Sequence, residues 1–240
     1  TSFSRRFYRI RTIIRKRKGP IAMIRITVLF LSIFITTKTI SQNSENAKLL
    51  LDEVSTKMGA YKNMSISFSE TLSNEDAGIK EGEEPPLKSK IILQGDKYTL
   101  NYLGNKFIFD GKKLFVINND EKEVTITDGD MNGDDGFIYP SKLLTFYNEG
   151  YNFEMGDLKN INDRKIQYIT LKPIDSESDI IRVELGIDIT KMHIYKLIQT
   201  GLNGSKTTFT ITEFKKNQTL SNNFFSFDEE KYKKLKFIID

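Results

Sequence analysis

Apolar and polar residues alternate over most of the chain beyond residue 63, and this period of two is typical of β-strands whose faces differ in burial. About eleven such segments, rich in Ile, Val, Thr, Tyr and Phe, cover residues 64–72, 88–94, 97–103, 106–110, 114–118, 123–127, 151–155, 165–173, 180–186, 194–200 and 206–214. Short turns such as Asp110-Gly111 join most of them. The spacing predicts a large antiparallel meander and excludes alternating βαβ units.

Two segments have helical character. Residues 45–61 repeat apolar residues at helical spacing after a candidate N-cap, Ser44. Residues 140–149 begin with Pro and Ser and end before Gly150, which predicts a short helix with a dense apolar face. With no linker visible, the sequence predicts one mainly β (α+β) domain over 42–240: a single curved antiparallel sheet with an N-terminal helix and a short second helix packed on it.

The first 41 residues differ from the rest in charge. They hold ten basic residues and no acidic one, whereas 26 basic and 32 acidic residues follow. Met23 opens a short basic region and an apolar run typical of a signal peptide over 23–41, with cleavage near Ser41. We interpret 1–22 as a non-native or disordered basic extension; the alternative is a membrane anchor over 1–37. An exported chain without Cys would lack a lipid anchor and remain soluble in the periplasm. The acidic net charge of the chain after residue 41 argues against nucleic-acid binding.

Candidate chemistry is sparse. The chain has no Cys and one His, which excludes disulfides and thiol catalysis and leaves His193 as the sole imidazole base. No nucleophile motif accompanies it, so the sequence favours a surface turn residue with no role, and predicts no enzyme and no cofactor. Residues 128–134 match the first half of a calcium loop, but Tyr139 replaces the required Glu, which favours a solvated acidic loop over a calcium site.

The informative feature is apolar surface. Apolar residues alternate with polar ones on several strands, as they do where one face of a sheet packs on the core. For any single apolar residue, a place in the core is the simplest interpretation. A single sheet covered by two helices nevertheless has more apolar face than two helices fill. We therefore expect a pocket for a long apolar ligand on its concave side.

Several motifs occur in an order that suggests a family. They are the helix that starts at Ala47, the stretch Leu93–Asn101, the strand–turn–strand Phe107–Ile117 with Glu123–Ile126 after it, Pro140–Leu144, and Asn223–Asp228. Together they resemble the LolA family of periplasmic outer-membrane lipoprotein carriers, in which the last two would be the lid helix and the terminal strand.

This resemblance implies a half-open barrel whose hydrophobic cavity holds the acyl chains of lipoproteins and carries them to the outer membrane. It implies as partners acylated lipoproteins, an inner-membrane release transporter and an outer-membrane acceptor, with a monomeric carrier. The cavity and lid residues would be Phe68, Tyr98, Leu100, Phe107, Phe109, Leu114, Leu143, Leu144, Phe146 and Tyr147. The alternative is a sheet module that binds protein partners in envelope signalling or surface export.

Overall fold

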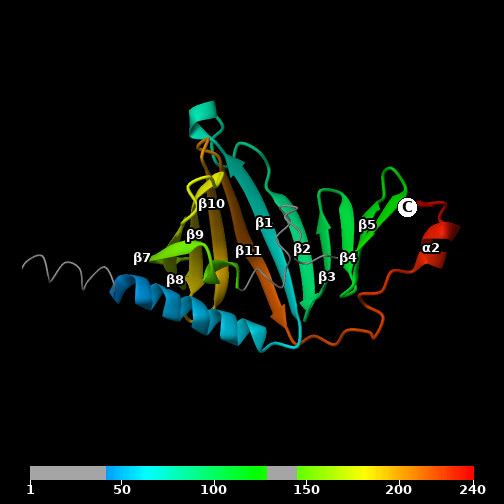
Figure 1. Ribbon diagram of the computed structural model, residues 1–240, viewed down its shortest axis with the longest axis horizontal. Helices are drawn as coiled ribbons and strands as arrows, with labels where there is room; N and C mark the ends of the chain where they lie inside the picture. Colours follow the sequence, from blue (N-terminus) through cyan, green and yellow to red (C-terminus); the bar gives the residue numbers. More distant parts are fainter. Residues whose placement is uncertain (1–41, 129–144) are drawn as a thin grey trace, which may run out of the picture. The chain divides into compact units, whose positions relative to one another are not determined.

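The predicted sheet is present, with one strand more than expected. A computed structural model describes residues 42–128 and 145–240, and residues 43–240 make up one compact unit. Twelve strands form one curved sheet in the order β12-β6-β5-β4-β3-β2-β1-β11-β10-β9-β8-β7 (Figure 1). The signal peptide, the basic extension, the calcium-like loop after Asp128, and the lid residues Leu143 and Leu144 lie outside the described residues.

All eleven predicted strands exist. Their bounds are β1 Met64–Ser73, β2 Leu87–Gln94, β3 Lys97–Tyr102, β4 Asn105–Phe109, β5 Lys113–Asn118, β6 Glu123–Asp128, β7 Tyr151–Ile161, β8 Arg164–Pro173, β9 Ile180–Asp188, β10 His193–Gly201 and β11 Lys206–Lys216. The twelfth, β12 (Ile238–Ile239), pairs in parallel with β6, whereas the other neighbours are antiparallel.

The described helices are fewer than the strands, and all but the first are short. A helix over 42–59 confirms the N-terminal prediction, and none of the described helices is long and apolar enough to span a bilayer. Two single turns of 3-10 helix follow, η1 (Glu75–Ala77) and η3 (Phe146–Asn148), and η3 is all of the predicted lid helix that the described residues contain. A further short helix, α2 (Glu229–Lys234), lies near the C-terminus in addition to the two helices of the predicted architecture.

The predicted terminal strand at 223–228 is wrong. Residues 222–225 form a turn, in which the N–H of Phe224 donates to the carbonyl of Ser221 at 3.1 Å. The segment then ends at Asp228, whose carboxylate accepts the N–H of Lys231 at 3.0 Å and caps α2. The backbone groups here are satisfied by turns and a cap, so they do not need a strand partner.

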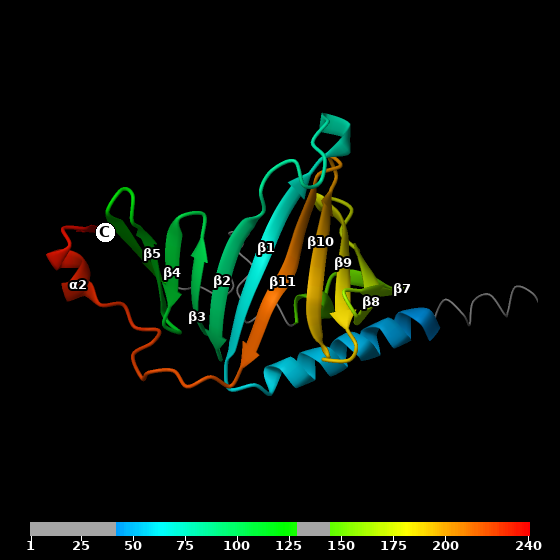
Figure 2. The same cartoon turned by 180° about the vertical axis from the view of Figure 1, so that it is seen from behind.

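Apolar side chains collect on both faces of the sheet. The inner cluster lies on the face that the N-terminal helix covers, where the helix buries Ala47, Leu51, Val54 and Met58. The outer cluster lies on the opposite face of β4–β6 and packs against Tyr232 of α2; it contains Ile108, Phe115, Ile117 and Val124. Figures 1 and 2 both place the N-terminal helix along one end of β9–β11 and α2 beside β5.

The sheet is interrupted between β10 and β11. These strands pair only over Lys196–Thr200, although β11 continues beside β1 to Lys216. Register shifts occur on both sides of the interruption, between Ser67 and Phe68 on β1 and between Ile194 and Lys196 on β10. The first residues of β10 therefore pair with β9 alone, and an opening separates them from β11.

Candidate functional site

The sheet register brings the predicted cavity residues together. Tyr98 of β3 lies opposite Phe109 of β4, and Phe109 in turn lies opposite Leu114 of β5. Leu100 pairs with Phe107 in the same way. Because directly paired residues project from the same face of an antiparallel sheet, all five share one face. That face is the inner one, where Phe68, Phe146 and Tyr147 join the same apolar cluster.

Burial divides these eight residues into two groups. Tyr98 and Phe109 are each 1% exposed, with ring centroids 5.6 Å apart, and Tyr147 is 4% exposed. These three form part of the packed core. The others are only half-buried against the inner cluster, and they are Phe68, Leu100, Phe107, Leu114 and Phe146. The surface that a ligand could cover is therefore made by the half-buried group.

The described end of the predicted lid is attached to both the sheet and the helix. Phe146 meets the ring of Tyr151 edge-on at 5.8 Å, and Tyr147 meets Phe153 in the same way at 6.4 Å. The Tyr147 hydroxyl lies 3.5 Å from a carboxylate oxygen of Asp52. Burial raises the pKa of Tyr147, so the phenol stays protonated and can donate to that carboxylate.

One polar group on the inner face was missed in the sequence. Glu70 is 9% exposed, and its Oε2 has no hydrogen-bond partner among the described residues. Burial, and secondarily a hydrogen bond to Glu70, raise the pKa of Tyr102 to about 12. The alternation on β1 places position 70 on the same face as Phe68, so this signal was available in the sequence.

The prediction for His193 as a surface turn residue is wrong. It is the first residue of β10, is 6% exposed, and stacks on Phe214 with ring centroids 4.7 Å apart. Its Nδ1 lies 2.9 Å from the carbonyl oxygen of Ile194. Burial lowers the pKa of the imidazole, which favours the neutral form. In the part of the chain that the structure describes, no group of three or more His, Asp or Glu side chains could hold a metal ion.

The sequence pattern of a known family decides the classification. The pattern of the family described as "Outer membrane lipoprotein carrier protein LolA" matches residues 103–228, more than half of the chain. The chain belongs to the LolA family. The matched segment includes β4–β11, so it contains the strand–turn–strand motif from which the resemblance was inferred. None of the curated proteins matches the sequence.

One solved structure supports the fold of this LolA-family chain, and two others are more distantly similar. An uncharacterized conserved protein from Thermus thermophilus superposes with a TM-score of 0.53 at 9% identity, covering 81% of this chain and 98% of its own. A LolA superfamily protein from Nitrosomonas europaea has a TM-score of 0.38 at 11% identity, covering 76% and 98%. The lipoprotein LppX from Mycobacterium tuberculosis has a TM-score of 0.41 at 13% identity, covering 72% and 98%. At such identities the first of these superpositions speaks for the fold alone.

Proposed function

We propose that this LolA-family chain is a soluble periplasmic carrier, which binds the acyl chains of lipoproteins on its inner face and delivers them to the outer membrane. The observation that carries the proposal is the half-buried apolar surface of Phe68, Leu100, Phe107, Leu114 and Phe146 around a packed core. Membership of the family supports the choice of lipoproteins as cargo. A release transporter in the inner membrane and an acceptor at the outer membrane would be its partners.

Transfer free energy is sufficient for this function without any covalent chemistry. Burying an acyl chain contributes about 0.8 kcal/mol per methylene, which amounts to roughly 12 kcal/mol for a chain of about 16 carbons. Release therefore needs a surface that does not enclose the chain completely. Half-buried residues fit this need, because part of their apolar area can be covered by the ligand and uncovered again.

A lipopeptide-binding experiment tests the proposal. The purified protein would be titrated with a fluorescent triacylated lipopeptide and with the same peptide lacking acyl chains. Leu100→Asp places a carboxylate on the inner face beside Phe107, and we expect it to weaken lipopeptide binding at least tenfold. Asn101→Asp introduces the same side chain at the next position, which is exposed on the opposite face, and should leave binding unchanged.

The two peptides separate this function from its alternative. A carrier of acyl chains should bind the lipopeptide and ignore the unacylated peptide. Equal binding of both peptides would contradict the proposal and favour a module that recognises protein partners. Mass spectrometry of the protein isolated from the periplasm of its host provides a second readout, because a carrier should retain acylated peptide or lipid.

A further inference from the structure

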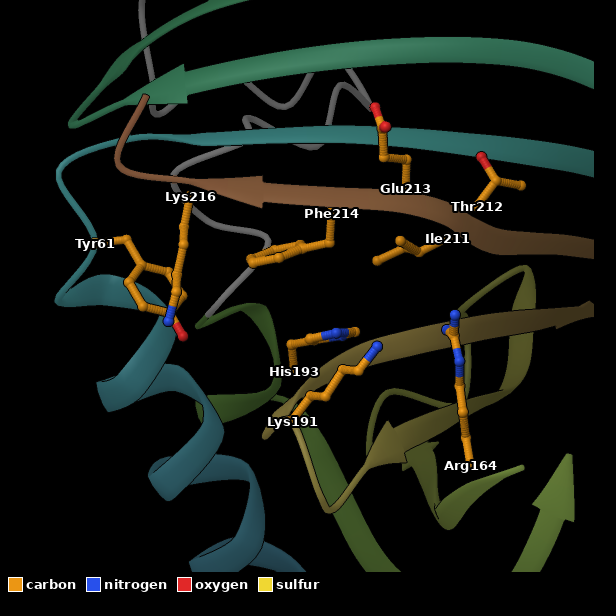
Figure 3. A pocket seen from close by; sticks show the side chains of 9 residues that line it. All are labelled: Tyr61, Arg164, Lys191, His193, Ile211, Thr212, Glu213, Phe214 and Lys216. Carbon is orange, nitrogen blue, oxygen red and sulfur yellow. The ribbon is translucent and has the colours of Figure 1, made fainter. Parts of the chain in front are cut away.

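The opening between β10 and β11 holds a pocket that the proposed function does not use. Its volume is about 330 Å³, and Figure 3 shows the nine side chains around it. They are Tyr61, Arg164, Lys191, His193, Ile211, Thr212, Glu213, Phe214 and Lys216. β-Bulges are common next to functional sites because they redirect side chains, and the register shifts at Ser67/Phe68 and Ile194/Lys196 flank this pocket.

Three cations line the pocket, and none of them has an ion-pair partner within residues 42–128 and 145–240. Arg164 lies over the ring of Tyr195 at 5.2 Å, and Lys216 lies over the ring of Tyr61 at 4.6 Å. Lys191 belongs to the turn that connects β9 to β10. Aromatic faces hold a cation in place without neutralising its charge, so Arg164 and Lys216 keep their capacity to bind an anion.

The two acidic groups nearby do not cancel this charge. Glu213 binds Lys215 at 2.7 Å, and in Figure 3 it lies on the other side of β11 from His193. Asp188 is 1% exposed and supports the turn, because its Oδ1 accepts the N–H groups of Thr190 and Lys191 at 3.1 and 2.9 Å. The three cations of the pocket therefore exceed the negative charge near them, which comes from the one buried carboxylate of Asp188.

A histidine, whose Nε2 becomes a donor only when the ring is protonated, completes the arrangement. His193 uses Nδ1 toward the carbonyl of Ile194, and its Nε2 has no hydrogen-bond partner among the described residues. Stacking on Phe214 fixes the ring beside the cations. If an anion binds, protonation of Nε2 would add a fourth positive charge and another donor.

We propose that this pocket binds a phosphate group through Arg164, Lys191 and His193, with Lys216 adding positive charge from the side of the pocket next to Tyr61. A guanidinium presents parallel N–H donors that match phosphate oxygens, and ammonium groups add charge from other directions. A carboxylate would need fewer cations than the pocket supplies, whereas a phosphate can accept from several at once. The phosphate is either a free ion or the headgroup of an amphiphile, whose apolar part would continue past Ile211 and Phe214 onto the inner cluster.

The single histidine makes the site directly observable. The imidazole C–H resonance of His193 can be followed by proton NMR in the untagged protein without assigning other residues. Inorganic phosphate at low ionic strength should shift this resonance in a saturable way and raise the imidazole pKa, because the anion favours the charged form. Acetate at the same concentration should bind at least tenfold more weakly.

A matched pair of double variants tests the assignment. Arg164→Gln/Lys216→Gln should weaken phosphate binding at least tenfold. Lys112→Gln/Lys165→Gln removes the same charge from two exposed residues outside the pocket and should bind as the unaltered protein does. If the first double variant does not fold, the single change Lys191→Gln on the exposed turn should still weaken binding severalfold.

Two lipid probes distinguish the sources of the phosphate. Dihexanoylphosphatidic acid binding at least tenfold more tightly than inorganic phosphate supports a headgroup site, and equal affinities support a site for the free ion. Dihexanoylglycerol, which lacks the phosphate, should leave the His193 resonance in place. The proposal is overturned if neither phosphate probe shifts the resonance, if acetate equals phosphate, or if the pocket variants bind as the control does. These outcomes are independent of lipopeptide binding, so failure here is distinct from failure of the carrier function.

Discussion

The two halves of the sheet use their faces differently. In β4, Phe107, Ile108 and Phe109 follow one another without a polar residue, and apolar side chains collect there on both faces of the sheet. In β8, by contrast, Ile169 and Leu171 point to the inner cluster while Thr170 lies on the outer face. A continuous apolar run in a strand therefore indicates that a second element packs on the outer face of the sheet. In this protein the C-terminal segment supplies that cover through α2 and β12.

The largest expected effect comes from removing the anchor of this second cover. Tyr232 is 8% exposed, stacks on Phe227 at 5.2 Å and meets Phe237 at 5.0 Å. Tyr232→Ala should lower the free energy of unfolding by about 3–5 kcal/mol, the cost of truncating a large buried aromatic side chain. Chemical denaturation measures this, with the exposed Lys234→Ala on the same helix as the control. A loss below about 1 kcal/mol would mean that α2 does not cover the outer cluster.

A somewhat smaller effect should follow at Ile169 of β8, which lies on the inner face. Ile169 is 0% exposed in the inner cluster, so Ile169→Ala should cost about 2–4 kcal/mol in the same unfolding measurement. Thr170→Ala, one position further on the opposite face, should change stability by less than about 0.5 kcal/mol. Similar losses for both variants would show that this half is also covered on both faces.

The free energy of unfolding should depend on pH through His193, which lies at the opening between β10 and β11. Burial lowers the pKa of His193, with Arg164 and Lys191 acting in the same direction and Asp188 opposing them. The unfolded chain therefore takes up this proton at higher pH than the folded chain does. The stability that His193 contributes is present above its ordinary pKa, about 6.5, and is lost as the pH falls through that value.

Urea unfolding at pH 7.5 and pH 5.5 measures this contribution. The unaltered protein should be less stable at the lower pH. His193→Phe keeps an aromatic ring against Phe214 but cannot titrate, so its stability should fall less over the same interval. An equal fall in both proteins would assign the effect to other groups.

The smallest expected effect is on the exposed outer surface of β7 and β8. Lys172 and Glu154 form an ion pair at 2.8 Å, and both side chains are more than half exposed. Lys172→Ala should change the free energy of unfolding by no more than about 0.5 kcal/mol, because solvent screens such pairs. Any difference should disappear in 1 M salt. A larger or salt-independent loss would indicate that the outer surface of β7 and β8 is shielded from solvent.

The sequence predicted the strands well because most of them alternate over their whole length. β7 shows where this fails: the prediction ended at residue 155, whereas the strand continues to Ile161 beyond a register shift after Met155. Gly156 and Asp157 interrupt the alternation there. The five predicted cavity residues on β3–β5 lie on one face for the same reason, because short turns fix the register of these strands.

The C-terminal cover and the basic pocket could not be predicted in the same way. α2 is six residues long with one buried anchor, although Asp228 followed by Glu229 and Glu230 is the pattern of a capped helix start. β12 contains two residues and depends on a partner more than 100 positions earlier. The pocket combines residues from separate hairpins where two strands part, and no local spacing in the sequence marks that separation.

The short parallel pairing at one end of the sheet has a consequence for behaviour at high concentration. β6 would otherwise end the sheet with unpaired backbone groups, but Ile126 donates to the carbonyl of Asp240 at 2.9 Å and Ile238 donates to that of Lys122 at 2.9 Å. The other end is β7, whose register shift leaves no long regular ladder. Unprotected edges template the joining of sheets from different molecules into aggregates. Because both ends of the sheet are blunted, the molecule can keep half-buried apolar residues on its inner face and still resist joining with its own copies.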